Sequence, residues 1–302
     1  MVLSRVMEES FVSSRPVAGR LVALEFLPAR PLTLLGPAWA TLCGAIASGG
    51  VLTHPQSFLF IVLLFLLCDA LLGAWRAHWL RADWRTALPQ NLARAQIWLA
   101  LPDDPSESFR TRLARFVSRR VKFARGVIWP LIDSEIIGMM IAGVLALCIA
   151  VVLGWLPTLL TGGALILALI EGQLNLQVGA GLRAIFEITL PWLIAQSALG
   201  ALSWLTLVFV LGYTLVYLAL LDLSATRNER RVLLSNLTQV AIIVLLIATN
   251  TPAGAGMVAL GLLAQILWQF RFQADRDGRA YAQRVQSYLL IAMLVTAFSL
   301  WL

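Results

Sequence analysis

The sequence predicts an all-α polytopic membrane protein, and three observations support that prediction. Of the 302 residues, 60% are hydrophobic and only 13% are charged, and the mean hydropathy is +0.83. Soluble domains are about 45–50% apolar and about 25% charged. The apolar residues gather in nine segments, and Lys and Arg fall only between alternate segments. Soluble enzymes, disordered chains and nucleic-acid-binding proteins are therefore excluded as classes, and the excess of positive charge indicates contact with a membrane surface.

Nine apolar segments define the expected membrane helices, since one span needs about 20 mostly apolar residues. They cover 32–52, 56–75, 136–155, 157–171, 188–202, 203–222, 232–249, 252–270 and 285–302. Gly154 and Pro157 predict a turn between the third and fourth segments. The run from Leu190 to Leu221 is too long for one helix, so we expect a break near Gly200, where small residues gather.

The distribution of positive charge predicts how the spans are oriented. The segments 1–31, 76–135, 172–187, 223–231 and 271–284 hold all 23 Lys and Arg residues, and the connections on the other side hold none. Cytoplasmic loops carry an excess of Lys and Arg. We therefore expect a cytoplasmic N-terminus, nine spans, and a C-terminus on the opposite side, in one membrane domain over 1–302. Arginine far outnumbers lysine, as in GC-rich bacterial genomes, so we expect the bacterial cytoplasmic membrane.

The cytoplasmic segment 76–135 is long and basic. Within it, residues 105–125 begin with a helix start signal at Pro105-Ser106-Glu107 and continue as an amphipathic pattern rich in Arg. The pattern predicts a helix on the membrane surface with anionic lipid as its partner, because each basic residue there contributes about 1 kcal/mol. The alternative is a docking site for a partner membrane subunit.

Carboxylates lie at the cytoplasmic ends of two spans. Asp69 precedes the end of the second span, and Asp222 and Glu229 lie at and after the end of the sixth. An ionisable residue inside a span is costly and is a functional candidate. If the two helix ends meet, these acids form a site suited to Mg²⁺ and diphosphate. The alternative is that Asp69 pairs with Arg76 and the other acids are solvated helix ends.

Short motifs follow the nine segments in order. They are Arg30-Pro31, Cys68-Asp69, Arg85 to Pro89, Gln196 to Gly200, Asp222 with Ala225 and Glu229, and Asp275 to Tyr281. In this order the chain resembles, over nearly its whole length, the UbiA superfamily of intramembrane prenyltransferases. The resemblance implies a nine-helix bundle whose active site opens to the cytoplasm between acidic motifs after helices 2 and 6.

The resemblance also implies a set of site residues. Two Mg²⁺ ions bridge a diphosphate to the acidic motifs in active members, and this chain offers Asp69, Asp222 and Glu229 as metal ligands. Arginines often bind such anions, and the candidates here are Arg76, Arg85 and Arg183. Gln196 falls in the family's Gln-x-x-Leu-Gly motif of helix 5.

The motifs depart from the family pattern where acids are expected. The later acids of the first motif fall at Leu72 and Arg76, and one acid of the second falls at Ala225. Two functions are therefore expected as alternatives. The first is an Mg²⁺-dependent enzyme that transfers a prenyl group from a prenyl diphosphate to an aromatic, tetrapyrrole or lipid acceptor. The second is a catalytically inactive relative that binds an isoprenoid, quinone or pigment tail, or serves as a structural subunit of a membrane complex.

Overall fold

The computed structural model describes residues 32, 35–52, 57–81, 129–171, 176–226, 229–275 and 278–301. The chain divides into two compact units, Met1–Ala23 with Ala82–Met139 and Leu24–Arg81 with Met140–Leu302. Of the first unit, only the start of one helix is described. The predicted lipid-binding segment 105–125, the N-terminal segment 1–31 and Arg85 lie outside the described residues, and the expectation of a single domain stays a prediction.

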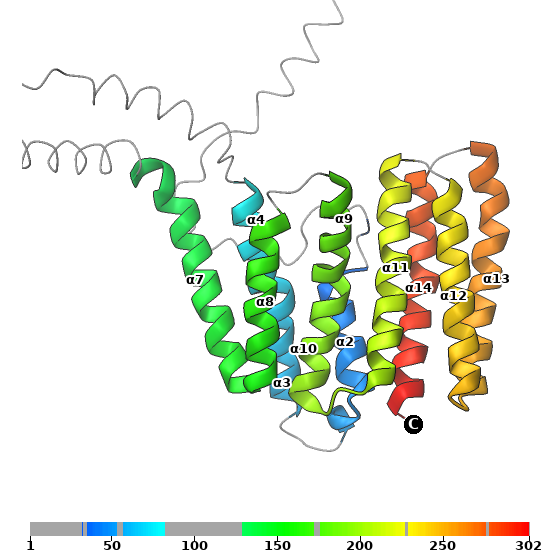
Figure 1. The fold of residues 1–302 in the computed structure, drawn as a ribbon, viewed down its shortest axis with the longest axis horizontal. Coiled ribbons are helices and arrows are strands. Elements are labelled where there is room, and N and C mark those ends of the chain that lie inside the picture. Colours follow the sequence, from blue (N-terminus) through cyan, green and yellow to red (C-terminus); the bar gives the residue numbers. More distant parts are fainter. Residues whose placement is uncertain are drawn as a thin grey trace, which may run out of the picture. The chain divides into compact units, whose positions relative to one another are not determined.

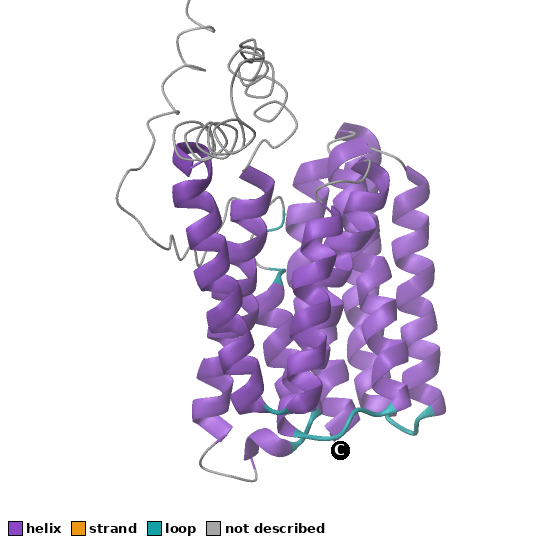
Figure 2. Cartoon of the chain, turned by 60° about the vertical axis from the view of Figure 1, so that its left-hand side comes forward, coloured by secondary structure: helices purple, strands orange, loops and turns teal. Residues whose placement is uncertain are grey.

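The described residues are almost entirely helical and contain no strand (Figures 1 and 2). In chain order the helices are α2 (Pro37–Ala47), α3 (Ser57–Phe65), α4 (Leu72–Arg81), α7 (Trp129–Leu153), α8 (Trp155–Glu171), α9 (Leu176–Ala184), α10 (Leu190–Leu199), α11 (Trp204–Thr226), α12 (Glu229–Ala248), α13 (Pro252–Asp275) and α14 (Gly278–Trp301). A 3₁₀ turn, η1, covers Gly50–Leu52, and two π-helical turns, η2 (Leu66–Leu71) and η4 (Ile185–Thr189), join α3 to α4 and α9 to α10.

Both expected breaks in the apolar run are present. α7 ends at Leu153 and α8 begins at Trp155, and Gly154 between them has φ +130°, a conformation that side-chain-bearing residues rarely adopt. α10 ends at Leu199 and α11 begins at Trp204, so the chain turns at Gly200.

Five helices are long and apolar enough to cross a membrane: Ser57–Trp79, Trp204–Ser224, Arg230–Ala248, Pro252–Phe272 and Gly278–Trp301. Three further apolar helices are shorter, namely Pro37–Ala47, Ile137–Leu153 and Trp155–Glu171. The structure therefore supports an all-helical membrane protein. The number of nine spans and the compartments of the termini stay predictions.

Within the larger unit, charged side chains gather at one end of the helices. Consecutive long helices from α8 to α14 run in alternating directions, with the C-terminus at the end opposite to the one where α11 finishes (Figure 1). The described turns at that opposite end, at Gly154, Gly200 and Asn250, lie inside uncharged stretches of the sequence, namely 141–170, 188–221 and 232–270. Antiparallel packing thus brings the Arg, Asp and Glu residues of separate helices to one shared end.

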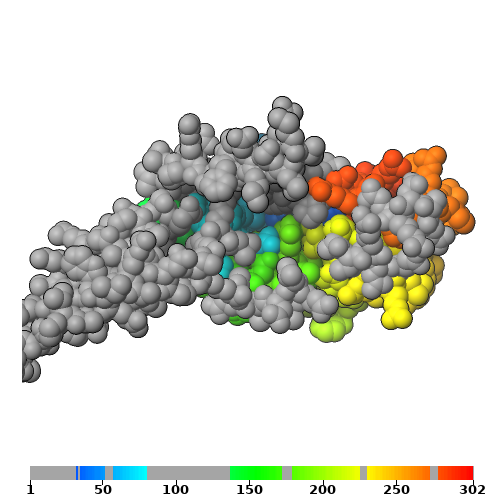
Figure 3. All heavy atoms as spheres, turned by 90° about the horizontal axis from the view of Figure 1, so that it is seen from above, coloured from blue at the N-terminus to red at the C-terminus, as the bar shows by residue number. Residues whose placement is uncertain are grey.

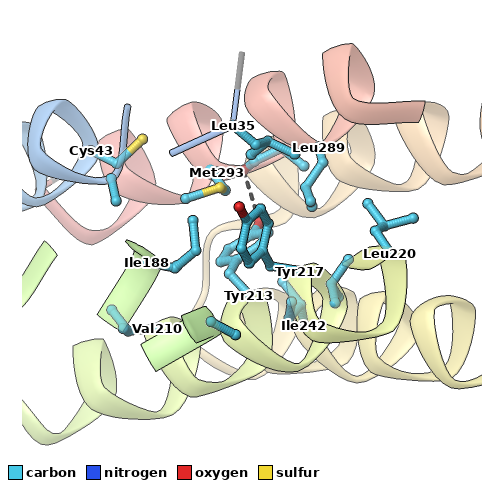
Figure 4. Close-up of a cluster of buried hydrophobic side chains, with 14 of the residues drawn as sticks. Leu35, Cys43, Ile188, Val210, Tyr213, Tyr217, Leu220, Ile242, Leu289 and Met293 are labelled. Atoms are coloured by element: carbon cyan, nitrogen blue, oxygen red, sulfur yellow. Dashed lines mark hydrogen bonds between the residues drawn. The ribbon is translucent and has the colours of Figure 1, made fainter. Parts of the chain in front are cut away.

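The core of this unit lies around α11. Phe209, Tyr213 and Tyr217 are fully buried there, together with Trp192 of α10, whose ring stacks on Tyr213 at a centroid distance of 6.3 Å. The Tyr213 hydroxyl lies 2.9 Å from the Ala292 carbonyl oxygen, to which it donates. Figure 4 shows both tyrosines among apolar side chains of the surrounding helices. Burying large aromatic rings on one central helix fixes the packing of its neighbours.

A buried glutamine pair joins the outer helices α12 and α13. The Gln239 Nε2 donates to Gln265 Oε1 at 2.8 Å, and the two side chains are 0% and 1% exposed. Hydrogen bonds between membrane helices typically contribute about 0.6 kcal/mol and at most about 1.7 kcal/mol.

We predict that Gln239→Leu destabilises the protein by about 1 kcal/mol, because Gln265 then keeps a buried amide without its partner. The double variant Gln239→Leu with Gln265→Leu is expected to recover most of this loss. Thermal unfolding in detergent measures both changes. Equal stability of the single and double variants contradicts the pairing.

Candidate functional site

Each of the two π-helical turns contains one buried carboxylate. In η2 the Leu72 N–H bonds to the Leu67 carbonyl, and Asp69 lies within this turn at 7% exposure. In η4 the Leu190 N–H bonds to the Ile185 carbonyl, and Glu187 is 1% exposed. Single π turns inside α-helices are rare and occur frequently at functional sites. The two turns therefore indicate Asp69 and Glu187 as candidate functional residues.

The proline after η4 explains why the helix widens there. Pro191 is the second residue of α10. In a regular α-helix a proline ring clashes with the carbonyl four residues earlier, which here belongs to Glu187. The π turn at Ile185–Thr189 separates these groups and adds one residue to the turn. The helix continues through the charged residues, so it begins at Leu176, well before the predicted apolar segment 188–202.

Arg76 is held by two glutamates from other helices. Its Nε and Nη2 donate to the two carboxylate oxygens of Glu171 at the end of α8, both at 2.7 Å. Its Nη1 donates to Oε1 of Glu187 at 2.7 Å. The Arg76 side chain is 13% exposed and that of Glu171 is 9% exposed. A bidentate guanidinium–carboxylate pair with a third charged bond is a strong, directional arrangement.

Glu187 is the centre of this network. Besides Arg76, it accepts a bond from Nε of Arg183 at 3.0 Å and a short one from the Tyr217 hydroxyl of α11. Two arginines thus face two glutamates, and the formal charges of the four groups cancel. We call Arg76, Glu171, Arg183, Glu187 and Tyr217 the Glu187 network. It joins α4, α8, α9, η4 and α11 at the charged end.

Tryptophans dock α4 onto α8 next to the network. The indole nitrogens of Trp75 and Trp79 donate to the carbonyls of Leu165 and Leu169, at 3.3 and 3.1 Å. The guanidinium of Arg76 lies 5.5 Å from the centroid of the Phe186 ring. The interface therefore combines apolar packing with the ion network, so removing a charge there alters the contact between helices as well as the electrostatics.

Asp222, the second predicted metal ligand, pairs with Arg231. Its carboxylate lies 2.9 Å from Nη2 of Arg231, and the side chains are 18% and 38% exposed. This pair joins the end of α11 to the start of α12. Glu229 begins α12, but its side chain lies outside the described residues.

Gln196 serves a different end of the molecule. Its Nε2 donates to the Ala201 carbonyl at 3.3 Å and to the Thr206 hydroxyl at 3.0 Å, which closes the turn between α10 and α11. It lies nine positions after Glu187 along the helix, a rise of about 13 Å. Gln196 therefore does not join the charged site.

The predicted residues thus meet only in part. The structure brings Arg76 and Arg183 together on Glu187, a residue outside the predicted set. No group of three or more His, Cys, Asp and Glu side chains suited to a metal is found where the chain is described. Arg76 stands where the resemblance expects an acid, and its guanidinium bonds to Glu171 and Glu187. A single Mg²⁺ held by Asp69, Asp222 and Glu229 stays a prediction.

Comparison with protein-family models, curated proteins and solved structures gives no match for this chain.

Proposed function

We propose that this chain is a non-catalytic UbiA-like membrane protein that binds an isoprenoid lipid. The observation that carries the proposal is the bonding of Arg76. The resemblance expects a metal-binding acid at this position, and the arginine found there is held by Glu171 and Glu187. In this proposal, an internal ion network takes the place that a metal ion and its diphosphate occupy in active members of the family.

The charges of this network favour isoprenoid binding without prenyl transfer. Prenyl transfer needs cations that stabilise the leaving diphosphate, preorganised at the place where its charge develops. Arg76 and Arg183 share Glu187, so their charge is already offset by carboxylates at hydrogen-bond distance. If a diphosphate displaced these bonds, the Glu187 carboxylate, which is now 1% exposed, would lose its partners. Its negative charge would then repel the diphosphate. The apolar tail of an isoprenoid requires no such cation.

The binding proposal is tested with geranylgeraniol and the straight-chain alcohol of the same carbon number, added to purified protein in nanodiscs. We expect the isoprenoid to bind about tenfold more tightly, because the resemblance implies a cavity that accepts a prenyl chain. Tryptophan fluorescence titration gives both dissociation constants. Equal affinity for the two alcohols, or no binding of either, contradicts the proposal.

Prenyl transfer is the second candidate, and one observation favours it. Asp69 lies buried in the π turn η2, at the place that the first acidic motif of the family would occupy. A buried carboxylate that is kept inside a span is a functional candidate. The two candidates differ in whether Mg²⁺ changes the affinity for a prenyl diphosphate.

A further inference from the structure

Two arginines lie against one tryptophan where α13 and α14 approach the charged end. The guanidinium carbon of Arg271 lies 5.0 Å from the centroid of the Trp268 ring, and that of Arg284 lies 4.8 Å from it. The two cations are therefore within about 10 Å of each other, each at cation–π distance. The indole nitrogen of Trp268 donates to the Tyr288 hydroxyl at 3.2 Å, which fixes the ring between the two helices.

These two arginines differ from three others at this end, which are paired with carboxylates. Arg76, Arg183 and Arg231 each bond to a carboxylate. Among the described side chains, Arg271 and Arg284 form no ion pair, and both are exposed. Two like charges held near one ring repel each other. An anion within reach of both guanidinium groups offsets that repulsion and accepts charge-assisted hydrogen bonds.

The position of the pair along the helices fits a lipid headgroup. Arg271 lies four residues before the end of α13 and Arg284 six residues after the start of α14, so both lie within about 10 Å of the helix ends. Arginines at this depth extend toward the phosphate layer of a bilayer. Figure 3 looks onto this end and shows the orange and red residues of α13 and α14 at its edge.

An apolar surface continues from the arginines toward the middle of the helices. Leu267 and Leu260 of α13 are 70% and 63% exposed, and Ile291 of α14 is 52% exposed. Helical spacing places Leu260, Leu267 and Arg271 on one face of α13, and Arg284 and Ile291 on one face of α14. The two arginines thus suit the charged headgroup of a lipid, and the exposed apolar strip suits its acyl chains.

We propose that Arg271, Arg284 and Trp268 bind the headgroup phosphate of an anionic phospholipid, whose acyl chains lie along Leu260, Leu267 and Ile291. Free phosphate offers the same anion but lacks the chains, so it gains nothing from the apolar strip. This site is separate from the Glu187 network and does not depend on the proposed isoprenoid function.

Native mass spectrometry of the full chain, titrated with phosphatidylglycerol or phosphatidylcholine, tests the site. We expect Arg271→Gln with Arg284→Gln to weaken phosphatidylglycerol binding about tenfold and to leave phosphatidylcholine binding unchanged. Trp268→Leu is expected to weaken phosphatidylglycerol binding by a smaller factor, because the arginines lose their platform.

The matched control is Arg230→Gln with Arg279→Gln, which removes two exposed charges near the ends of α12 and α14 and leaves both cation–π contacts of Trp268 in place. It is expected to change the affinity less than about twofold. Inorganic phosphate in excess is expected to displace no lipid. Equal losses in the two double variants, unchanged affinity in the Arg271 and Arg284 variant, or displacement of the lipid by phosphate would overturn the proposal.

Discussion

Glu187→Gln is expected to destabilise the protein by about 3 kcal/mol or more. Glu187 is 1% exposed and accepts bonds from Arg76, Arg183 and Tyr217. Removing one partner of a buried ion pair costs about 3–5 kcal/mol, because the remaining charge stays buried without compensation. The lower part of this range applies here, since Arg76 keeps Glu171 and Arg183 is partly exposed. Thermal unfolding of the purified protein measures the loss.

The control for this prediction is Arg231→Gln, which breaks the more exposed pair with Asp222. Exposed pairs contribute about 0–1 kcal/mol, so a small change is expected. The triple variant Arg76→Met, Glu171→Gln and Glu187→Leu removes the buried charges together and is expected to be more stable than Glu187→Gln alone. A Glu187→Gln protein as stable as the Arg231→Gln protein would contradict the central role of this carboxylate.

Gly44→Val is expected to prevent α2 from packing on α10, with a loss of about 3 kcal/mol or failure to fold. A Cβ at Gly44 would overlap the carbonyl oxygen of Trp192, a backbone atom that cannot rotate away. Small residues let membrane helices approach this closely. Trp192 is fully buried and stacks on Tyr213, so a shift of α10 also disturbs the core around α11.

Gly163 of α8 provides the matched control. A Cβ there meets no atom within 4 Å. Gly163→Ala is therefore expected to leave stability unchanged or raise it by up to about 1 kcal/mol, because alanine favours the helix. We compare the two variants by their yield of monodisperse protein and by their unfolding midpoint. Equal behaviour of Gly44→Val and Gly163→Ala would show that α2 and α10 do not pack as described.

The helical fold could be predicted because apolar runs and turn residues are local signals. Gly154 and Gly200 divide the long runs, and the structure breaks its helices at both positions. The start of the fifth helical segment could not be predicted this way. Arg183 and Glu187 make residues 172–187 look like a loop, yet each neutralises the other one turn away, so the helix continues through them.

Only part of the candidate site could be predicted, because a local motif identifies single residues and does not show which residues of other helices contact them. The resemblance points to Arg76 and Arg183, but their shared partner Glu187 falls in the predicted cytoplasmic connection 172–187 and in none of the quoted motifs. The signal that would have found it is an acid directly before an apolar run and four residues after an arginine. Tyr217 carried no signal, because a tyrosine in an apolar span resembles any other core aromatic residue until α11 is placed beside η4.

The most direct test of the central claim is the Mg²⁺ dependence of prenyl diphosphate binding. A non-hydrolysable geranylgeranyl thiodiphosphate is titrated into the wild-type protein in nanodiscs, with Mg²⁺ and with chelator, by isothermal calorimetry. If the Glu187 network has replaced the metal centre, Mg²⁺ changes the dissociation constant less than about twofold, and Asp69→Asn and Asp222→Asn bind as the wild type does. Binding that is about tenfold tighter with Mg²⁺ and is lost in both variants would contradict the account and identify a prenyltransferase.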